Sequence, residues 1–144
     1  MNVPDEVLGY MAWHDICPMC GNYELRNKQT SGTLQDGAVT IKCRECKAVH
    51  KLSLDFIIDV GKPTGRGSGY APVVDDGDTV ASLCIDIAEY SNTISGFRIA
   101  NVLGEVTDDE RVGIAGCFEQ TEAKMHELIE EARRHGVFPN WKAR

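Results

Sequence analysis

The chain has 144 residues, and its 22 acidic and 15 basic side chains give a formal net charge of −7. A hydrophobic share of 42% is ordinary for a globular protein, and the length suits one domain or two small units that share a core. The acidic balance disfavours proteins that grip nucleic acid or anionic membranes over a wide surface, because such binding needs a basic face. No apolar run approaches the ~20 residues that a helix needs to cross a bilayer.

Residues 1–13 contain Asp5 and Glu6 but no lysine or arginine. A secretory signal begins with basic residues before an apolar stretch, so this start predicts a cytoplasmic protein with no membrane partner. Disulfides are rare in that compartment, and paired Cys-x-x-Cys sequences there indicate metal binding or redox chemistry. Residues 4–12 predict a short helix, because Pro4 suits a first helical position and the two acids suit the positive end of the helix dipole.

Residues 16–60 are typical of β structure. Short strands are predicted at 23–26 (YELR) and at 38–42 (AVTIK), the second being rich in β-branched residues. The strongest strand signal lies at 50–60, where apolar and polar residues alternate. The apolar face of that strand consists of Leu52, Leu54, Phe56, Ile58 and Val60. A small metal site cannot cover such a face, so another element must pack on it.

Residues 61–78 (GKPTGRGSGYAPVVDDGD) are dense in Gly, Pro and Asp and predict a linker. The glycines and cations of residues 61–70 raise the alternative of a phosphate-binding loop. That segment fits neither G-x-x-x-x-G-K-[ST] nor G-x-G-x-x-G, so a connector is the favoured interpretation.

Helical spacing dominates after the linker. Residues 79–88 predict a helix capped by Asp78 or Thr79, with a strand at 83–87 as the alternative. Residues 95–103 predict a second helix. A helix-turn-helix motif across this region is disfavoured, because the acids that open the next helix would face DNA phosphates, whereas capping explains them fully.

The last helix, at 108–135, has the strongest support. Thr107 and Glu110 form a capping box, and Gly136 suits the left-handed position after the final turn. Two glycines within this helix, Gly113 and Gly116, suggest the close approach of another backbone, either of this chain or of a partner chain. The apolar stripe consists of Ile114, Phe118, Thr121, Met125, Leu128, Ile129 and Ala132.

Four of the six cysteines form two pairs separated by 22 residues: Cys17-x-x-Cys20 and Cys43-x-x-Cys46. One tight turn can aim both sulfurs of a pair at one ion, and two such turns complete the tetrahedron of a structural zinc site. Four thiolates leave no open position for water or substrate, so the site should stabilise structure rather than catalyse a reaction. Iron, and disulfide or thiol chemistry, are less favoured alternatives. His14 and His50 flank the pairs, but four sulfurs already suffice.

The sequence CPMCG at 17–21 resembles the first knuckle of the zinc-ribbon superfamily, in which glycine takes a left-handed turn after the second sulfur. CRECK at 43–47 resembles the second knuckle, except that Lys47 stands where the family usually has glycine. A left-handed lysine costs on the order of 1 kcal/mol, so we expect a somewhat different turn there. The resemblance covers residues 13–52 and extends to small phage and bacterial ribbon proteins. It implies one bound Zn²⁺ but no particular function.

These patterns together predict an α+β fold. A four-cysteine zinc ribbon, extended by a long strand, should pack against a C-terminal helical part that ends in a long amphipathic helix. The expected units are the ribbon and strand at 1–60, the linker at 61–78 and the helical part at 79–144.

Charge is distributed unevenly along the chain. Residues 15–51 carry six basic and four acidic side chains, whereas residues 61–144 carry nine basic and fourteen acidic ones. The ribbon is therefore the basic pole of an acidic protein. By analogy with other ribbons, we expect a non-enzymatic regulator of transcription or replication that contacts nucleic acid. The contact residues would be Arg26, Lys28, Lys42, Arg44 and Lys47.

The alternative is an acidic protein–protein interaction module, an adaptor or inhibitor in which zinc is purely structural. Its partner contacts would be Glu122, Glu127, Glu130 and Trp141, with folding of Trp141 back onto the core as the alternative for that residue. No catalytic arrangement is recognisable in the sequence. Cys84 and Cys117 lack a placed histidine, and we expect both to fill the core.

Overall fold

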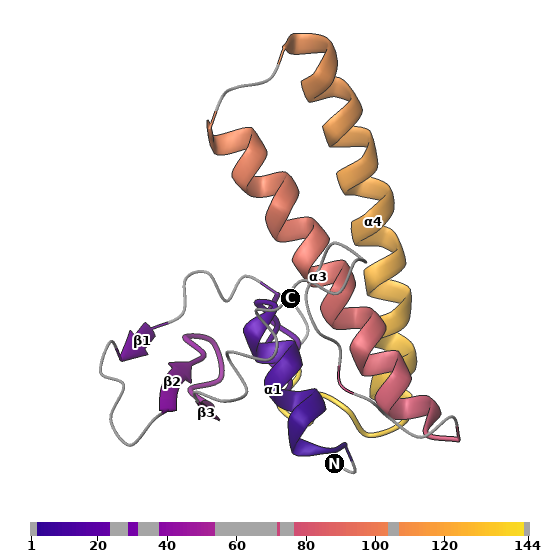
Figure 1. Cartoon of the computed structure of the whole chain (residues 1–144). Helices are drawn as coiled ribbons and strands as arrows, with labels where there is room; N and C mark the ends of the chain where they lie inside the picture. Colours follow the sequence, from indigo (N-terminus) through magenta and orange to yellow (C-terminus); the bar gives the residue numbers. More distant parts are fainter. Residues whose placement is uncertain are drawn as a thin grey trace.

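The computed structural model describes residues 3–23, 29–31, 38–53, 72, 77–103 and 107–142. The elements in chain order are α1 (Asp5–Trp13), β1 (Gln29–Ser31), β2 (Ala38–Lys42), β3 (Val49–Ser53), α3 (Thr79–Leu103) and α4 (Asp108–Arg134). This mixture confirms the predicted α+β class. In Figure 1, α3 and α4 run antiparallel and extend away from a base formed by α1 and the sheet. Most of the predicted strand at 23–26, residues 54–60 of the long strand and the Gly-rich segment 61–70 lie outside the described residues.

The three strands form an antiparallel sheet in the order β1-β2-β3. The strand predicted at 38–42 is confirmed as β2, and the described part of the long strand begins at Val49. In the register of β2 with β3, Ile41 lies opposite His50 and Lys42 lies opposite Val49. Ile41 is buried, and Leu52 on the same face of β3 is buried as well. This inner face lies toward the rest of the molecule, where β3 contacts α1.

One hydrophobic core joins the three described helices, because α3 packs against both α1 and α4. Its largest buried side chains include Tyr10 of α1, Ile87 and Ile94 of α3, and Met125 and Ile129 of α4. The last two belong to the stripe predicted for the final helix. Among the described residues, no helix combines the length and the apolar character that a membrane span requires.

The region predicted as two helices, at 79–88 and 95–103, is one continuous helix, α3. Its middle carries residues with weak helix propensity, and tertiary contacts hold them in place. The Ser91 hydroxyl donates a hydrogen bond of 2.7 Å to the backbone oxygen of His14. The Thr93 hydroxyl donates to the oxygen of Glu89, one turn earlier, at 3.1 Å. Both hydroxyl groups therefore donate to carbonyl oxygens, and the helix continues through these residues.

The predicted ends of α4 are confirmed. The Thr107 hydroxyl accepts a hydrogen bond of 3.2 Å from the backbone N–H of Glu110. At the other end Gly136 has φ 84°, and Val137 donates its N–H to the oxygen of Ala132 at 3.1 Å. This is the Schellman pattern, which turns the chain sharply after the helix. As a result, residues 137–141 run back toward the N-terminal part.

The expected close approach at Gly113 and Gly116 does not occur within the described part of the chain. A Cβ atom added at either glycine would have no neighbour within 4 Å, and both residues are exposed. Contact with a partner chain at these positions stays a prediction.

Candidate metal centre

The end of α1 delivers the first cysteine. Asp15 has φ 68°, and Ile16 donates its N–H to the oxygen of Met11 at 3.1 Å, so α1 also ends in a Schellman turn. The Asp15 carboxylate accepts a hydrogen bond of 3.2 Å from the hydroxyl of Ser95 on α3. This contact holds the turn against the helical core, and Cys17 follows directly after the buried Ile16.

The two cysteine knuckles have the same backbone pattern. In the first, Gly21 donates its N–H to the oxygen of Cys17 at 2.8 Å. In the second, Lys47 donates to the oxygen of Cys43 at 3.0 Å. Gly21 has φ 76° and Lys47 has φ 65°, so both residues after the second sulfur are left-handed. The expectation of a different second turn is therefore wrong, because the lysine adopts the conformation that glycine would take.

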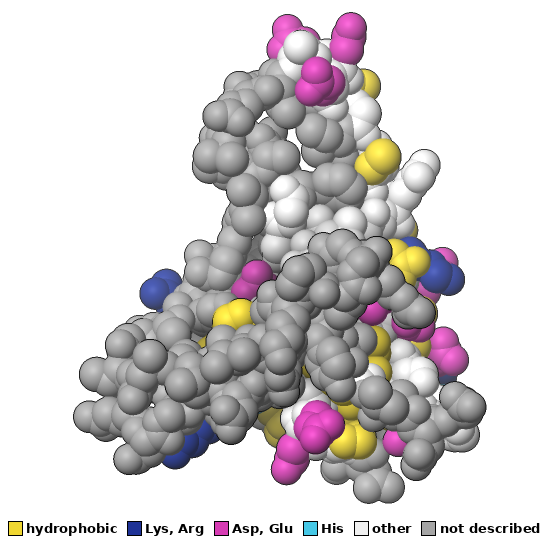
Figure 2. Space-filling view, viewed as in Figure 1, with side chains coloured by type: hydrophobic (Ala, Val, Ile, Leu, Met, Phe, Trp, Pro, Cys, Tyr) yellow, Lys and Arg dark blue, Asp and Glu magenta, His cyan; other side chains and the backbone are white. Residues whose placement is uncertain are grey.

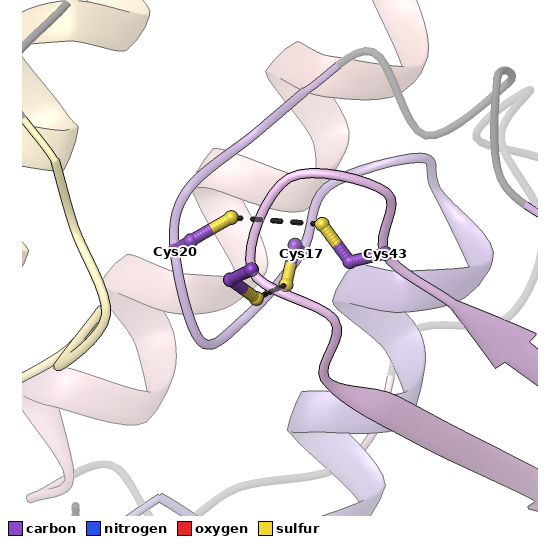
Figure 3. A group of neighbouring side chains, drawn as sticks. Cys17, Cys20 and Cys43 are labelled. Carbon is purple, nitrogen blue, oxygen red and sulfur yellow. Dashed lines mark hydrogen bonds between the residues drawn. The ribbon is translucent and has the colours of Figure 1, made fainter.

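The four cysteine sulfurs converge from these two knuckles (Figure 3). All four lie within 4.8 Å of one another, and the Cys17–Cys46 and Cys20–Cys43 sulfur pairs are each 3.7 Å apart. A sulfur tetrahedron around an ion at about 2.3 Å has edges of about 3.8 Å. Cys17, Cys20 and Cys43 are buried, and Cys46 is partly exposed. The group fits a tetrahedral metal ion and has the size of a single site.

Two polar side chains lie beside the sulfurs. His50 places Nε2 3.5 Å from the Cys17 sulfur, and the Asn22 amide donates to the Cys43 sulfur at 4.0 Å. The Asn22 amide, and His50 in the tautomer that carries its proton on Nε2, would stabilise thiolate charge around a metal. His14, the other flanking histidine, instead packs its ring edge-on against Tyr10 with a centroid distance of 4.4 Å. The sequence placed both histidines near the site but could not separate their roles.

The thiols share protons unequally. The pKa of Cys20 is lowered to about 5, first by the neighbouring thiol of Cys17 and also by the Asn22 backbone N–H. The hydrogen bond with Cys20, together with burial, raises the pKa of Cys17. Burial raises the pKa of Cys46 as well. The lowered pKa of Cys20 favours its thiolate, which is the form of cysteine that binds metal.

Three of the five cations predicted to contact nucleic acid lie on or beside the second knuckle. Lys42, Arg44 and Lys47 are all exposed, whereas Arg26 and Lys28 lie outside the described residues. Lys51 is exposed too, and the register places it on the outer face of the sheet together with Lys42. Because Lys42 pairs with Val49, that face also carries an apolar side chain that is 60% exposed.

The glutamates predicted to contact a partner all make contacts within this chain. Glu122 accepts a hydrogen bond of 3.0 Å from the hydroxyl of Tyr23, which also lies 3.2 Å from Nε2 of His126. Glu127 and Glu130 are exposed and form pairs within α4, with Lys124 at 3.5 Å and with Arg133 at 2.8 Å. No local signal in the sequence indicates the Tyr23 contact, because its partners lie about 100 residues away.

The tail after α4 folds back, and Trp141 is partly buried against the core and the first knuckle. The two single cysteines differ from each other. Cys84 is buried in the core, as expected, and burial together with Asp78 raises its pKa to about 12. Cys117 is exposed on α4, so the expectation that it fills the core is wrong.

No protein-family model matches this chain, and no curated protein or solved structure matches it either.

Proposed function

We propose that the four cysteines hold one structural Zn²⁺, as the resemblance to zinc ribbons implies. The spacing of the sulfurs and their burial support a closed tetrahedral site, which suits zinc. Metal binding of this type contributes about 10–16 kcal/mol in small zinc fingers, so it would dominate the stability of the knuckles.

Elemental analysis of the purified protein tests the metal. We expect one zinc per chain, with Cys20→Ser losing the metal and the fold of both knuckles. Cys117→Ser is the matched control, because this cysteine is exposed and lies far from the site in sequence. It should retain the full zinc content. Iron in place of zinc, or a Cys20→Ser protein that keeps its zinc and its fold, would contradict this assignment.

We further propose that the zinc-bound part of the chain contacts nucleic-acid phosphates, as a non-enzymatic accessory factor in transcription or replication. The supporting observation is the group of exposed cations on the second knuckle and the adjoining strands, defined here as the cationic face: Lys42, Arg44, Lys47 and Lys51. Lys42, Arg44 and Lys51 form no ion pair with any residue that the structure describes. Cations that form no ion pair with a described residue are available to phosphates as far as this part of the chain is concerned.

Fluorescence anisotropy with labelled single- and double-stranded DNA and RNA tests this function. The variant Lys42→Glu/Arg44→Glu/Lys47→Glu should bind more than about tenfold more weakly than the zinc-loaded wild type. The control Lys124→Glu/Arg134→Glu/Lys142→Glu makes the same change of net charge at exposed positions of the helical part. It should bind like the wild type. Equal loss in both variants, or no wild-type binding at low salt, would contradict the proposal.

A second candidate is a protein partner bound by the far end of α4. Asp108, Asp109 and Glu110 are exposed there, and Figure 2 shows acidic side chains gathered at this end of the helical pair. Val112 beside them is 75% exposed. This end of α4 suits a partner contact better than Glu122 and Trp141, whose side chains make contacts within the chain. This candidate would be favoured if the Lys42→Glu/Arg44→Glu/Lys47→Glu variant still binds a protein partner of the wild type. The Asp108→Lys/Asp109→Lys variant should lose that partner.

A further inference from the structure

The segment that follows α4 lies directly on the first knuckle. This segment, residues 137–141, is called the strap below. Val137 and Phe138 are each only 2% exposed, and both belong to the helical core. Asn140 donates its backbone N–H to the oxygen of Met19 at 2.7 Å. Because Met19 lies between Cys17 and Cys20, the strap bonds to the backbone of the turn that presents two of the four sulfurs.

The ring of Trp141 lies against Gly21, the next residue of the same turn. A Cβ atom at Gly21 would be 2.7 Å from Cζ3 and 2.8 Å from Cε3 of that ring, so only glycine allows this contact. The ring is held on its other sides by Phe138, at a centroid distance of 6.4 Å, and by the Arg133 guanidinium, 4.8 Å from the ring centroid. Gly21 therefore has two constraints, a left-handed φ of 76° and the tryptophan.

A third contact joins the knuckle to α4 itself. Tyr23, two residues after Gly21, donates its hydroxyl proton to Glu122 and lies edge-on to the ring of His126. The first knuckle is thus tied to the C-terminal quarter of the chain at Met19, Gly21 and Tyr23. By contrast, the second knuckle has exposed residues at Arg44, Glu45 and Lys47.

We propose that the strap is a latch on the metal centre, so that docking of Trp141 on Gly21 and retention of the metal by Cys17 and Cys20 stabilise each other. The metal sets the backbone of the turn on which the strap docks, and the docked strap opposes the opening of that turn. Such coupling is reciprocal: whatever factor the docked strap adds to metal affinity, the bound metal adds to strap docking. This inference rests on the metal proposed above but not on nucleic-acid binding.

The test measures the rate at which zinc passes from the loaded full-length protein to a chromogenic chelator. Trp141→Ala should release zinc about tenfold faster than the wild type, which is a coupling of ordinary size. Lys142→Ala is the matched control, because it changes the neighbouring exposed residue. Ile87→Val, which removes a methyl group from the helical core on α3, controls for general loss of stability. Both controls should release zinc at the wild-type rate.

A double-mutant cycle makes the test specific to this contact. Gly21→Ala places a methyl group in the Trp141 ring, so it should speed release strongly in the wild type. In the Trp141→Ala background the clash is absent, and only the cost of a left-handed alanine remains. The effect of Gly21→Ala should therefore be several-fold smaller there. Equal effects in the two backgrounds, or equal release from Trp141→Ala and Lys142→Ala, would overturn the latch. A wild-type protein that binds no metal would overturn the metal assignment and the latch together.

Discussion

Three residues other than glycine adopt left-handed backbone conformations in the described part of the chain. All three lie in turns that build the metal centre or the strap. Asp15 ends α1 before Cys17, Lys47 follows Cys46, and Phe138 begins the return of the strap. A left-handed side chain costs roughly 1–2 kcal/mol, so the surrounding contacts must stabilise each of these turns. At Lys47 one such contact is visible, because its Nζ donates to the oxygen of Arg44 at 2.7 Å.

Replacing Lys47 with glycine should therefore stabilise the metal-loaded protein. Removal of the left-handed strain gains about 1–2 kcal/mol, and the greater backbone entropy of unfolded glycine offsets about 0.5–1 kcal/mol of this. We expect a net gain of about 0.5–1 kcal/mol, measured as the free energy of unfolding at buffered zinc. Lys42→Gly is the control, because Lys42 is exposed in the extended strand β2, where glycine should destabilise by about 0.5–1 kcal/mol. Destabilisation by both changes would show that the lysine at 47 is not strained.

At this scale the sequence predicted what depends on local spacing and missed what depends on distant contacts. The spacing of the cysteines and the left-handed Gly21 follow from the needs of a tight turn around one ion. The contact of Gly21 with Trp141 joins residues 120 positions apart, and no periodicity or motif encodes it. For the same reason the sequence could suggest that Trp141 folds back or meets a partner but could not choose between them.

Among the elements, the prediction was best where one signal repeated over many residues. The final helix was correct at both ends because a cap, an apolar stripe and a terminal glycine all agreed. The prediction failed in the middle of α3, where local propensity and tertiary structure disagree. Ser91 and Ser95 weaken the helical signal in the sequence, but their hydroxyls bond to His14 and Asp15 at the end of α1. The interface between α1 and α3 is therefore polar at this end and apolar around Ile87.

This interface also contains a buried titratable group, His14. Burial lowers its pKa below the ordinary value of 6.5, whereas a hydrogen bond with Asn92 and the charge of Asp15 act in the opposite direction. Tyr10 packs on the ring from α1, and Ser91 of α3 donates a hydrogen bond to the backbone oxygen of the same histidine. Because the folded pKa lies below the unfolded one, the unfolded chain binds the proton more tightly. Stability from His14 is thus present above pH 6.5 and falls as the pH drops below that value.

The expected result is a fall in the free energy of unfolding between about pH 7.5 and pH 5.5 that is shallower in His14→Gln than in the wild type. Denaturant titrations at fixed zinc measure it. His50, whose pKa burial also lowers, contributes equally to both proteins, so the difference between their curves isolates His14. His135→Gln changes an exposed histidine and should reproduce the wild-type slope. Parallel curves for wild type and His14→Gln would mean that protonation of this ring carries no cost.

For the whole molecule, the important feature is the separation of charge. The exposed acids at the start of α4 lie at the far end of the helical pair, and the cationic face lies at the base, on the second knuckle and the sheet (Figures 1 and 2). Because the net charge of −7 opposes the approach of nucleic acid, we expect the proposed contact to be made at the cationic face. The protein would therefore contact few phosphates, and the bound nucleic acid would be restricted to the base of the molecule.

This restriction predicts a shallow dependence of nucleic-acid binding on salt. If all four cations of the cationic face contact phosphates of a duplex, the logarithm of the binding constant should fall against the logarithm of salt concentration with a slope of about −3.6, and with about −2.8 on single strands. Lys51→Gln removes one contact and should make the duplex slope shallower by about 0.9, because one counterion fewer is released. Lys124→Gln, on the exposed surface of α4, should leave the slope unchanged. A slope much steeper than about −4, retained in Lys51→Gln, would place the phosphates on residues outside the cationic face and contradict this model of binding.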